Sequence, residues 1–350
     1  MSVDAVYTWV NGLDPKWREA YDRFVALDAE KRGERDPASA GAIRHTDNGE
    51  LRYSLRSLEQ YAPFVRRIHL VIDGSPPDWL DASASDVRIL SHREIFPEGF
   101  PLPVFSSDLI EAFLWRIPNL SEQYIYFNDD TLLASQCAPE DFFDAQKRSF
   151  VKMIPDLICA PRGPVDFVYS QMLRNTERAV RRRLALTYRP RFPTRKPWVP
   201  LIARRLIQNK LSLNGTAHVA QPFHRSLWPL FHEVFAKELT TLSASRFRHR
   251  RGFCVNQAYQ YLAYQQRKAL FTFDSSDLFI PRRAAPAELK ALQADARDAA
   301  KKGIKFLCFN DGIADSELDW AAFIDETLRG ILGTPSRWEK RLSSSTEQSR

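Results

Sequence analysis

Hydrophobic positions in the first 150 residues alternate between short β-forming runs and segments with helical spacing. Leu51, Leu55 and Leu58 fall on one face of a helix, which predicts a helix over residues 50–61. A second helix is predicted over residues 107–115, and Pro118 marks its end. Four strands are predicted at Val3–Val10, Ile68–Ile72, Val87–Leu90 and Tyr124–Phe127. Strands that alternate with helices are typical of an α/β open sheet.

Beyond residue 150 the pattern becomes mainly helical. Helices are predicted over residues 226–239, 256–268 and 319–332, and one further buried strand over Phe306–Phe309. We expect the second half to be a helical elaboration that returns this strand to the sheet of the first half. The predicted division is an α/β part at 1–150, a mostly helical insertion at 151–300, a strand and helix that complete the core at 301–340, and a disordered tail at 341–350.

The positive charge of the chain is concentrated in one stretch. The formal net charge is +7, and residues 172–211 contain 12 Arg or Lys residues but one acidic residue, Glu177. Such a stretch suits an anionic membrane surface, a phosphorylated substrate or nucleic acid, and a solvated helical face is the alternative. Nucleic acid ranks last, because few aromatic residues are interleaved and no nucleic-acid-binding motif occurs. Arg181, Arg182 and Arg183 are the candidate membrane contact.

Cysteine usage and the N-terminal sequence indicate a cytoplasmic protein. The four cysteines are scattered singly, without a CxxC pair, which argues against a zinc ribbon or a disulfide framework. Asp4 and nearby polar residues interrupt the first apolar stretch, so it does not resemble a signal peptide. No apolar run approaches the roughly 20 residues that span a bilayer. We expect a cytoplasmic protein that the basic stretch can hold at the inner face of the membrane.

Three predicted strands end in clusters of carboxylate and amide side chains. The clusters are Asn11 with Asp14, Asn128 with Asp129 and Asp130, and Asn310 with Asp311. Hard oxygen ligands at a sheet edge are what Mg²⁺ or Mn²⁺ needs beside a diphosphate. A single cluster of this kind is more often a turn, and three together leave a metal site and ordinary turns as equal alternatives.

Two arginines of the first predicted helix are candidates for binding phosphate. Arg52 and Arg56 lie one helical turn apart, so both can reach the same phosphate group. The alternative is that they form surface ion pairs with Glu59 or Glu50.

Other titratable residues have less specific surroundings. His218 lies in a loop-like segment, NGTAHVAQPFHR, and a lone histidine of this kind is more often structural than catalytic. Glu111 and Arg116 are close enough in sequence to pair with each other. No GxSxG, P-loop or GxGxxG motif occurs, which disfavours acyl hydrolysis, P-loop phosphoryl transfer and dinucleotide binding.

Four blocks of sequence stand in order along nearly the whole chain. They are DAVYTWVNGLDP; NGELRYSLRSLEQYAPFVRRIHLVIDG with FSSDLIEAFLWRIPNLSEQYIYFNDDTLL; TAHVAQPFHRSLWPLF with SRFRHRRGFCVNQAYQYLAY; and KFLCFNDGIADSELD with TPSRWEK. These blocks resemble the four blocks of the Stealth family. That family includes bacterial capsular-polysaccharide phosphotransferases and the catalytic subunit of the lysosomal N-acetylglucosamine-1-phosphotransferase.

The resemblance implies a sugar-1-phosphate transferase. Such an enzyme moves hexose-1-phosphate, here expected to be N-acetylhexosamine-1-phosphate, from a UDP-sugar to an acceptor sugar hydroxyl and releases UMP, in capsule or exopolysaccharide synthesis. The expected cofactor is Mg²⁺ or Mn²⁺, because attack on phosphorus requires neutralised charge on the nonbridging oxygens. The expected fold is a Rossmann-like or glycosyltransferase-A-like open sheet with a helical, Arg-rich insertion in the second half.

The resemblance also assigns roles to parts of the chain and to single residues. It implies that residues 1–150 bind the nucleotide sugar and that the insertion at 151–300 lies on the acceptor side. Asp129, Asp130, Asn310 and Asp311 are the expected metal ligands. His218, Asp130, Arg52 and Arg56 are the expected catalytic residues, with His218 either deprotonating the acceptor or stabilising the phosphate. The expected substrate-binding residues are Asn11, Asp14, Asn48, Glu50, Glu111, Arg116, Arg246 and Arg248.

Two other functions remain open on the sequence. A metal-dependent glycosyltransferase would use a similar acidic strand end but release UDP. A noncatalytic module would use the basic stretch to bind an anionic polymer or a membrane.

Overall fold

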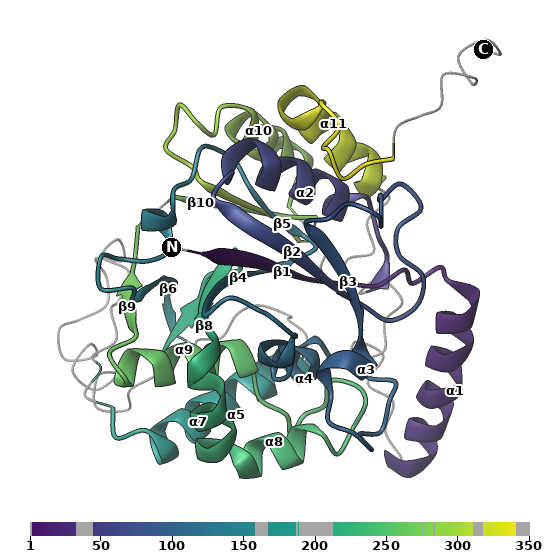
Figure 1. Ribbon diagram of the computed structural model, residues 1–350, viewed down its shortest axis with the longest axis vertical. Helices are drawn as coiled ribbons and strands as arrows, with labels where there is room; N and C mark the ends of the chain where they lie inside the picture. Colours follow the sequence, from purple (N-terminus) through teal and green to yellow (C-terminus); the bar gives the residue numbers. More distant parts are fainter. Residues whose placement is uncertain are drawn as a thin grey trace.

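Figure 1 shows a computed structural model of the chain. The structure describes residues 2–32, 45–157, 167–186, 188, 213–274, 276–282, 284–310 and 318–340. Asp311, the predicted disordered tail and the part of the basic stretch at 189–211 lie outside the described residues.

A five-stranded sheet with the order β3-β2-β1-β4-β8 forms the centre of the molecule. β1 (Val3–Trp9) is flanked by β2 (Val65–Ile72) and β4 (Gln123–Asn128), both parallel to it. β3 (Val87–Ser91) continues the parallel part beside β2, and β8 (Gln221–His224) runs antiparallel to β4 at the other edge. The predicted α/β open sheet is therefore confirmed.

Alternate residues of β1 contribute to two different hydrophobic cores. Ala5 and Tyr7 pack in one cluster with Leu51 and Leu55, whereas Val6 packs in the cluster on the opposite face. Successive side chains of a strand point to opposite faces, so a strand buried on both sides reads as a continuous apolar run. Helices must therefore cover both faces of the sheet.

Figure 1 shows these two helical layers. One layer contains α2 (Glu50–Tyr61), α10 (Pro286–Arg297) and α11 (Trp320–Leu332). The other layer contains α3 (His92–Ile95), α4 (Ser107–Glu111), α5 (Phe167–Arg183), α7 (Trp228–Val234), α8 (Ala236–Leu242) and α9 (Val255–Gln265). α1 (Pro15–Arg32) follows β1 at the end of the sheet. Short 3₁₀ helices occupy Leu114–Arg116, Pro139–Asp141 and Arg225–Leu227.

Two smaller sheets flank the central one. The first has the order β10-β11-β5 and consists of β10 (Asp277–Pro281), β11 (Phe306–Asn310) and β5 (Thr131–Leu133). The second has the order β7-β6-β9 and consists of β7 (Asn214–Thr216), β6 (Ser149–Leu157) and β9 (Ala269–Thr272). Because β5 follows β4 after a short turn, the first small sheet brings β11 close to the end of β4.

The strand that returns to the central sheet is not the one the sequence predicts. β11 forms where it is expected, but it pairs with β5 and β10, so its predicted place in the central sheet is wrong. The returning strand is β8, in the segment that reads as a loop. Pro222 breaks the strand pattern there but is tolerated at a sheet edge, and Phe223 anchors the strand by stacking on Tyr124.

The segment at 151–300 also contains more sheet than expected. It contributes β7, β8, β9 and β10 in addition to its helices. The predicted helix over 226–239 is divided between α7 and α8 at Phe235, while the helix over 256–268 corresponds to α9. Among the described residues, no helix is sufficiently long and apolar to cross a membrane.

Candidate active site

The carboxyl ends of β1, β2 and β4 meet at one edge of the central sheet. Thr8 near the end of β1 lies beside Asn128 at the end of β4 in the parallel register. Asp14, after β1, accepts a hydrogen bond of 3.1 Å from the backbone amide of Ser75, after β2. This edge is where open α/β sheets bind their ligands, since the loops that follow the strands converge there.

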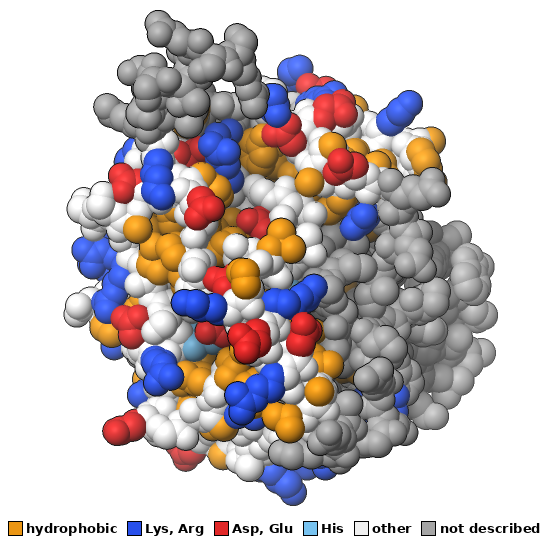
Figure 2. All heavy atoms as spheres, turned by 90° about the vertical axis from the view of Figure 1, so that its right-hand side faces the viewer, with side chains coloured by type: hydrophobic (Ala, Val, Ile, Leu, Met, Phe, Trp, Pro, Cys, Tyr) orange, Lys and Arg blue, Asp and Glu red, His pale blue; other side chains and the backbone are white. Residues whose placement is uncertain are grey.

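The surface at this side of the molecule carries both signs of charge. Figure 2 looks at the right-hand side of Figure 1, toward which β1 points, and acidic and basic side chains are interspersed over its described part. Such a surface differs from a large field of one sign, which would attract any polyanion. Specific side chains must therefore supply any recognition at this edge.

A chain of hydrogen bonds leads from the buried sheet to the surface at this edge. The hydroxyl groups of Thr8 and Tyr126 lie 2.8 Å apart, and the Tyr126 hydroxyl donates to Oδ1 of Asn128 at 2.8 Å. Nδ2 of Asn128 lies 2.7 Å from Nε2 of His218. Tyr126 is buried, whereas the side chain of His218 is 38% exposed. In this arrangement Nε2 accepts a hydrogen bond, so the neutral ring carries its hydrogen on Nδ1.

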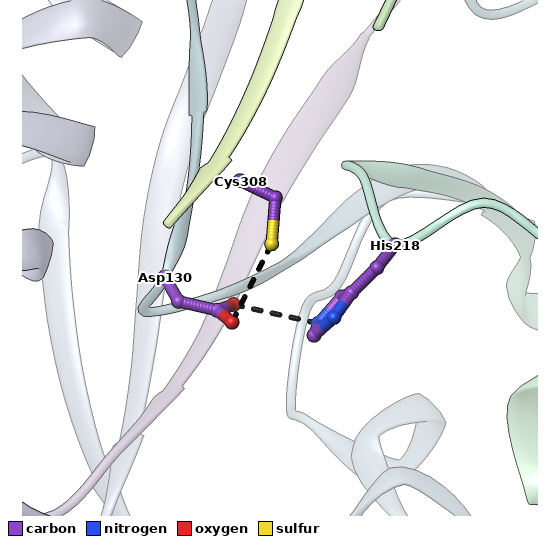
Figure 3. Close-up of side chains that lie close together, drawn as sticks. All are labelled: Asp130, His218 and Cys308. Atoms are coloured by element: carbon purple, nitrogen blue, oxygen red, sulfur yellow. Dashed lines mark hydrogen bonds and ion pairs between the residues drawn. The ribbon is translucent and has the colours of Figure 1, made fainter. Parts of the chain in front are cut away.

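Asp130 and Cys308 complete a group of three side chains around His218 (Figure 3). Asp130 Oδ1 lies 3.4 Å from Nε2 of His218, and Sγ of Cys308 lies 3.6 Å from Asp130 Oδ2. The three potential ligand atoms lie within 4.8 Å of one another. Asp130 Oδ1 is buried and has no hydrogen-bond partner among the described residues.

Backbone contacts of the turn between β4 and β5 fix this group. The hydroxyl of Thr131 donates to the carbonyl oxygen of Asn128 at 2.9 Å, which closes the turn around Asp130. The amide of Phe309 donates to the carbonyl oxygen of Asp130 at 2.9 Å, and Cys308 lies opposite Thr131 in the antiparallel register. Residues almost 180 positions apart in sequence are thereby brought into contact.

The group suits a divalent cation. Carboxylate, imidazole and thiolate all ligate metals, and the buried Asp130 Oδ1, which has no hydrogen-bond partner among the described residues, is an acceptor that a cation would satisfy. Sequence reasoning missed Cys308. The signal that points to it is the two-residue period of a strand, which places Cys308 on the same face of β11 as Asn310.

The oxygen-ligand set expected from the sequence is only partly described. Asp129 and Asp130 share the turn after β4, and Asn310 ends β11, where its carbonyl oxygen accepts a hydrogen bond from the backbone amide of Arg282. Asp311 lies outside the described residues. A site formed by all four side chains stays a prediction.

Asn11 and Asp14 lie at the same edge but have local partners. Asn11 Oδ1 accepts from the amide of Leu13 at 3.0 Å, and Asp14 Oδ1 accepts from the amides of Lys16 and Trp17 at the start of α1. These are the hydrogen bonds of a turn and a helix N-terminus. A role in nucleotide-sugar binding stays a prediction for both.

Asn48 and Glu50 form a compact unit at the N-terminus of α2. The backbone amide and the Nδ2 group of Asn48 donate to the two carboxylate oxygens of Glu50 at 2.7 and 2.9 Å. Burial raises the pKa of Glu50 to about 7, because these hydrogen bonds offset only part of the cost of burying its charge. Ser54, one turn further along α2, donates to the carbonyl oxygen of Thr131, so Glu50 lies at the end of α2 nearest Asp130.

Arg52 and Arg56, expected at a phosphate, both bind Glu339 near the C-terminus. Arg56 donates through Nε at 2.6 Å and through a terminal nitrogen at 2.9 Å, and Arg52 donates through Nε at 2.5 Å. Another terminal nitrogen of Arg56 donates to the carbonyl oxygen of Leu332 at 3.0 Å. The pairs with Glu59 or Glu50 considered from the sequence are replaced by this distant carboxylate.

Glu111 and Arg248 belong to a buried network on the other face of the sheet. Arg248 donates to Asp108 at 2.9 Å and to the hydroxyl of Ser107 at 2.7 Å. Burial, and then the nearby Asp108, raise the pKa of Glu111 to about 8, while hydrogen bonding with Tyr126 acts against this shift. Glu111 therefore adjoins the buried end of the chain that leads to His218.

Arg116 and Arg246 lie apart from the group around Asp130. Arg116 donates to the carbonyl oxygen of Ile95 at 2.8 Å, so it does not form the pair with Glu111 that their spacing suggested. The guanidinium of Arg246 lies over the ring of Phe24, 4.2 Å from its centroid. Substrate binding by either arginine stays a prediction.

The arginines at the end of α5 are partly paired. Arg181 pairs with Glu177 at 2.9 Å, one turn back along the helix, and Arg183 pairs with Glu238 of α8 at 3.2 Å. The predicted membrane contact of Arg181, Arg182 and Arg183 stays a prediction.

Two family models match the first half of the chain. Stealth protein CR1, conserved region 1, matches residues 1–26, and Stealth protein CR2, conserved region 2, matches residues 44–151. These ranges contain β1, α2, β2 and β4, together with Asn128, Asp129 and Asp130. The resemblance seen in the first two sequence blocks is confirmed.

The curated relatives match different shares of the chain. Exopolysaccharide phosphotransferase SCO2594 of Streptomyces coelicolor is 31% identical over 344 residues, which are 97% of this chain and 51% of the relative. SCO6023 of the same organism, also named an exopolysaccharide phosphotransferase, is 47% identical over 40% of this chain and 23% of the relative. The capsular polysaccharide phosphotransferase cps1A of Actinobacillus pleuropneumoniae is 38% identical over 41% of this chain and 39% of its own length. The chain thus spans about half or less of each of these relatives.

Among solved structures, the galactosyltransferase LgtC in complex with donor and acceptor sugar analogs aligns over 98% of both chains. The sequence identity is 10% and the TM-score is 0.43. At that score the alignment adds nothing to the fold described above.

Proposed function

Because the chain carries conserved regions 1 and 2 of the Stealth proteins, we propose that it transfers hexose-1-phosphate from a UDP-sugar to a saccharide hydroxyl, with release of UMP. The observation that carries the proposal is the meeting of Asn128, Asp130 and His218 at the ligand-binding edge of the sheet. The relatives named as capsular or exopolysaccharide phosphotransferases support a saccharide acceptor and a place in polysaccharide synthesis.

The chain's own groups suit the charge changes of this reaction. In-line displacement at phosphorus develops negative charge on nonbridging oxygens, and fixed hydrogen-bond donors and cations stabilise it. With Nε2 facing Asn128, the Nδ1–H of His218 would donate a hydrogen bond to such an oxygen. With the Asn128 amide turned over, Nε2 would carry the hydrogen and Nδ1 would accept the proton of the acceptor hydroxyl. A divalent cation at Asp130 would supply the remaining positive charge.

The test is the identity of the released nucleotide. The protein is incubated with a panel of UDP-sugars, a saccharide acceptor and divalent cations, and the products are separated and examined by phosphorus NMR. UMP together with a phosphodiester is expected, and both should disappear when a chelator removes the cation. Release of UDP would identify a glycosyltransferase instead, and no product with any donor would overturn the proposal.

The role of His218 is tested by His218→Gln. We expect kcat to fall by about 100-fold or more with a smaller change in KM, because the ring acts on the developing charge. A pH profile of the wild-type protein then separates the two roles. A proton acceptor gives a kcat that falls at low pH, because protonation removes its lone pair. A hydrogen-bond donor gives no such fall, because Nδ1–H is present in both the neutral and the protonated ring.

Contact with an anionic membrane is part of the proposal. Arg174, Arg178 and Arg182 recur every four residues along α5 and are exposed, so they form one ridge. Co-sedimentation with anionic vesicles is expected for the wild-type chain and should be lost in the triple Arg→Glu variant. Equal vesicle binding by the wild-type chain and the triple variant would refute this membrane contact.

A further inference from the structure

The donor atoms around Asp130 differ chemically from those that Mg²⁺ requires. Mg²⁺ prefers six oxygen ligands in near-octahedral geometry. The group in Figure 3 offers a carboxylate oxygen, an imidazole nitrogen and a sulfur atom. Imidazole and thiolate are ligands of Zn²⁺ and of similar borderline-soft cations.

Two spacings in this group, each to a different oxygen of Asp130, match those between neighbouring ligands of a tetrahedral site. Bond lengths of about 2.0–2.3 Å to Zn²⁺ place neighbouring ligand atoms about 3.3–3.6 Å apart. Asp130 Oδ1 lies 3.4 Å from Nε2 of His218, and Asp130 Oδ2 lies 3.6 Å from Sγ of Cys308. All three ligand atoms lie within 4.8 Å of one another, so small side-chain movements suffice to close the site.

The surroundings of each ligand favour binding of a cation. With its hydrogen on Nδ1, the His218 ring presents an Nε2 lone pair, which a cation would take in place of the amide hydrogen of Asn128. Cys308 is buried on one side of the site, whereas the His218 side chain is 38% exposed on the other, which leaves a path of entry. Asp130 Oδ1 is a buried oxygen that lacks a hydrogen-bond partner among the described residues.

We propose that Asp130, His218 and Cys308 form a three-ligand site for a borderline-soft divalent cation of the class of Zn²⁺ or Co²⁺. Binding converts the Cys308 thiol to a thiolate and releases one proton to solvent. Three protein ligands leave a fourth position open, as in catalytic rather than structural zinc sites. The inference rests on the proposed function in that it names the cation of the same site.

The experiment is a titration of the reduced, metal-free chain with Co²⁺ alone, followed by absorption spectroscopy. We expect saturation at one equivalent, visible bands of tetrahedral Co²⁺, and a near-ultraviolet charge-transfer band from the thiolate. Cys308→Ser should abolish the charge-transfer band. Cys137→Ser and Cys254→Ser are matched controls, because both cysteines are buried and not disulfide-bonded but pack in other parts of the molecule, and both variants should retain the band.

Two further variants keep the proposal falsifiable if Cys308→Ser does not fold. Asp130→Asn and His218→Gln alter side chains that are partly exposed, and each should weaken Co²⁺ binding at least about 10-fold while the protein stays folded by circular dichroism. Unchanged Co²⁺ affinity in both variants, absence of the band in the wild-type chain, or its persistence in Cys308→Ser would overturn the site.

The titration is independent of the transfer reaction. The charge-transfer band without UMP formation from any donor would leave the cation site in place and refute the proposed function. UMP formation without the band would do the reverse.

Discussion

Two carboxylates of this protein occupy opposite chemical situations. Glu339 is almost fully buried and accepts hydrogen bonds from Arg52, Arg56 and the amide of Ser336. Burial alone would raise the pKa of Glu339, but these donors, with Arg56 the strongest, lower it to about 2. Asp130 has one buried oxygen without a hydrogen-bond partner among the described residues, and a thiol beside the other. A carboxylate whose oxygens are hydrogen-bonded within the chain stabilises the fold. A carboxylate with an oxygen that lacks such a partner is available to bind a ligand.

The largest effect on stability is expected at Glu339, the fully hydrogen-bonded carboxylate. Glu339→Gln leaves the buried charge of Arg56 without its partner, which should lower the free energy of unfolding by about 3–5 kcal/mol. Urea denaturation of the purified protein measures it. Glu326→Gln is the control, because Glu326 pairs with Arg297 on the surface at 3.4 Å and should cost less than about 1 kcal/mol. Equal denaturation midpoints for the two variants would show that the Glu339 cluster, which is Glu339 with Arg52 and Arg56, does not stabilise the fold.

At Asp130 we expect the opposite pattern, with a large loss of activity and little change in stability. Asp130→Asn should lower kcat/KM for UMP release by at least about 100-fold, or about 2.7 kcal/mol, while the free energy of unfolding stays equal or rises. Asp130 Oδ1 has no hydrogen-bond partner among the described residues, so the change to an amide costs the fold little. Asp295→Asn on α10 is a surface control for both measurements, because Asp295 pairs with Lys302. A loss of stability as large as that of Glu339→Gln would contradict the comparison.

Local regularity made most of the elements predictable. The helix over 50–61 has the bounds of α2, because Leu51, Leu55 and Leu58 supply a complete apolar face. Strands β1, β2, β3, β4 and β11 were likewise recognised from their apolar runs. Strand β8 was missed because its four residues include Pro222, and so short a run gives no period to detect.

Contacts over long sequence distances limited the prediction of the site. The turn at Asn128–Asp130 and His218 were recognised as chemically interesting, but spacing along the chain does not show that they meet. Arg56 and Glu339 are 283 positions apart, so nothing near Arg56 indicated that its guanidinium is already neutralised. Cys308 lies between apolar residues of the same strand, so nothing in the sequence marks it as a ligand. It becomes a candidate ligand once the pairing of β11 with β5 is known.

A third carboxylate sharpens the comparison through its pH dependence. Burial raises the pKa of Glu50 from its ordinary 4.5 to about 7, so folding is disfavoured when this group must be ionised. Its contribution is favourable below about pH 4.5 and is lost as the pH rises through 7. Between pH 5 and pH 8 the wild-type protein should therefore lose about 1–3 kcal/mol more stability than Glu50→Gln. Thermal melts of both proteins at the two pH values measure the difference, and parallel losses would place Glu50 in contact with water.

The smallest effect is expected at the exposed member of the Glu339 cluster. The Arg52 side chain is 43% exposed and that of Arg56 is 8% exposed, although both bind the same carboxylate. Arg52→Ala should therefore cost about 0.2–1 kcal/mol of unfolding free energy, because Arg56 alone still neutralises Glu339. We expect kcat/KM to change less than about threefold, since the Nε of Arg52 already has a partner within the chain. A loss of activity above 10-fold with unchanged stability would instead restore the phosphate-binding role that its place in the second sequence block suggested.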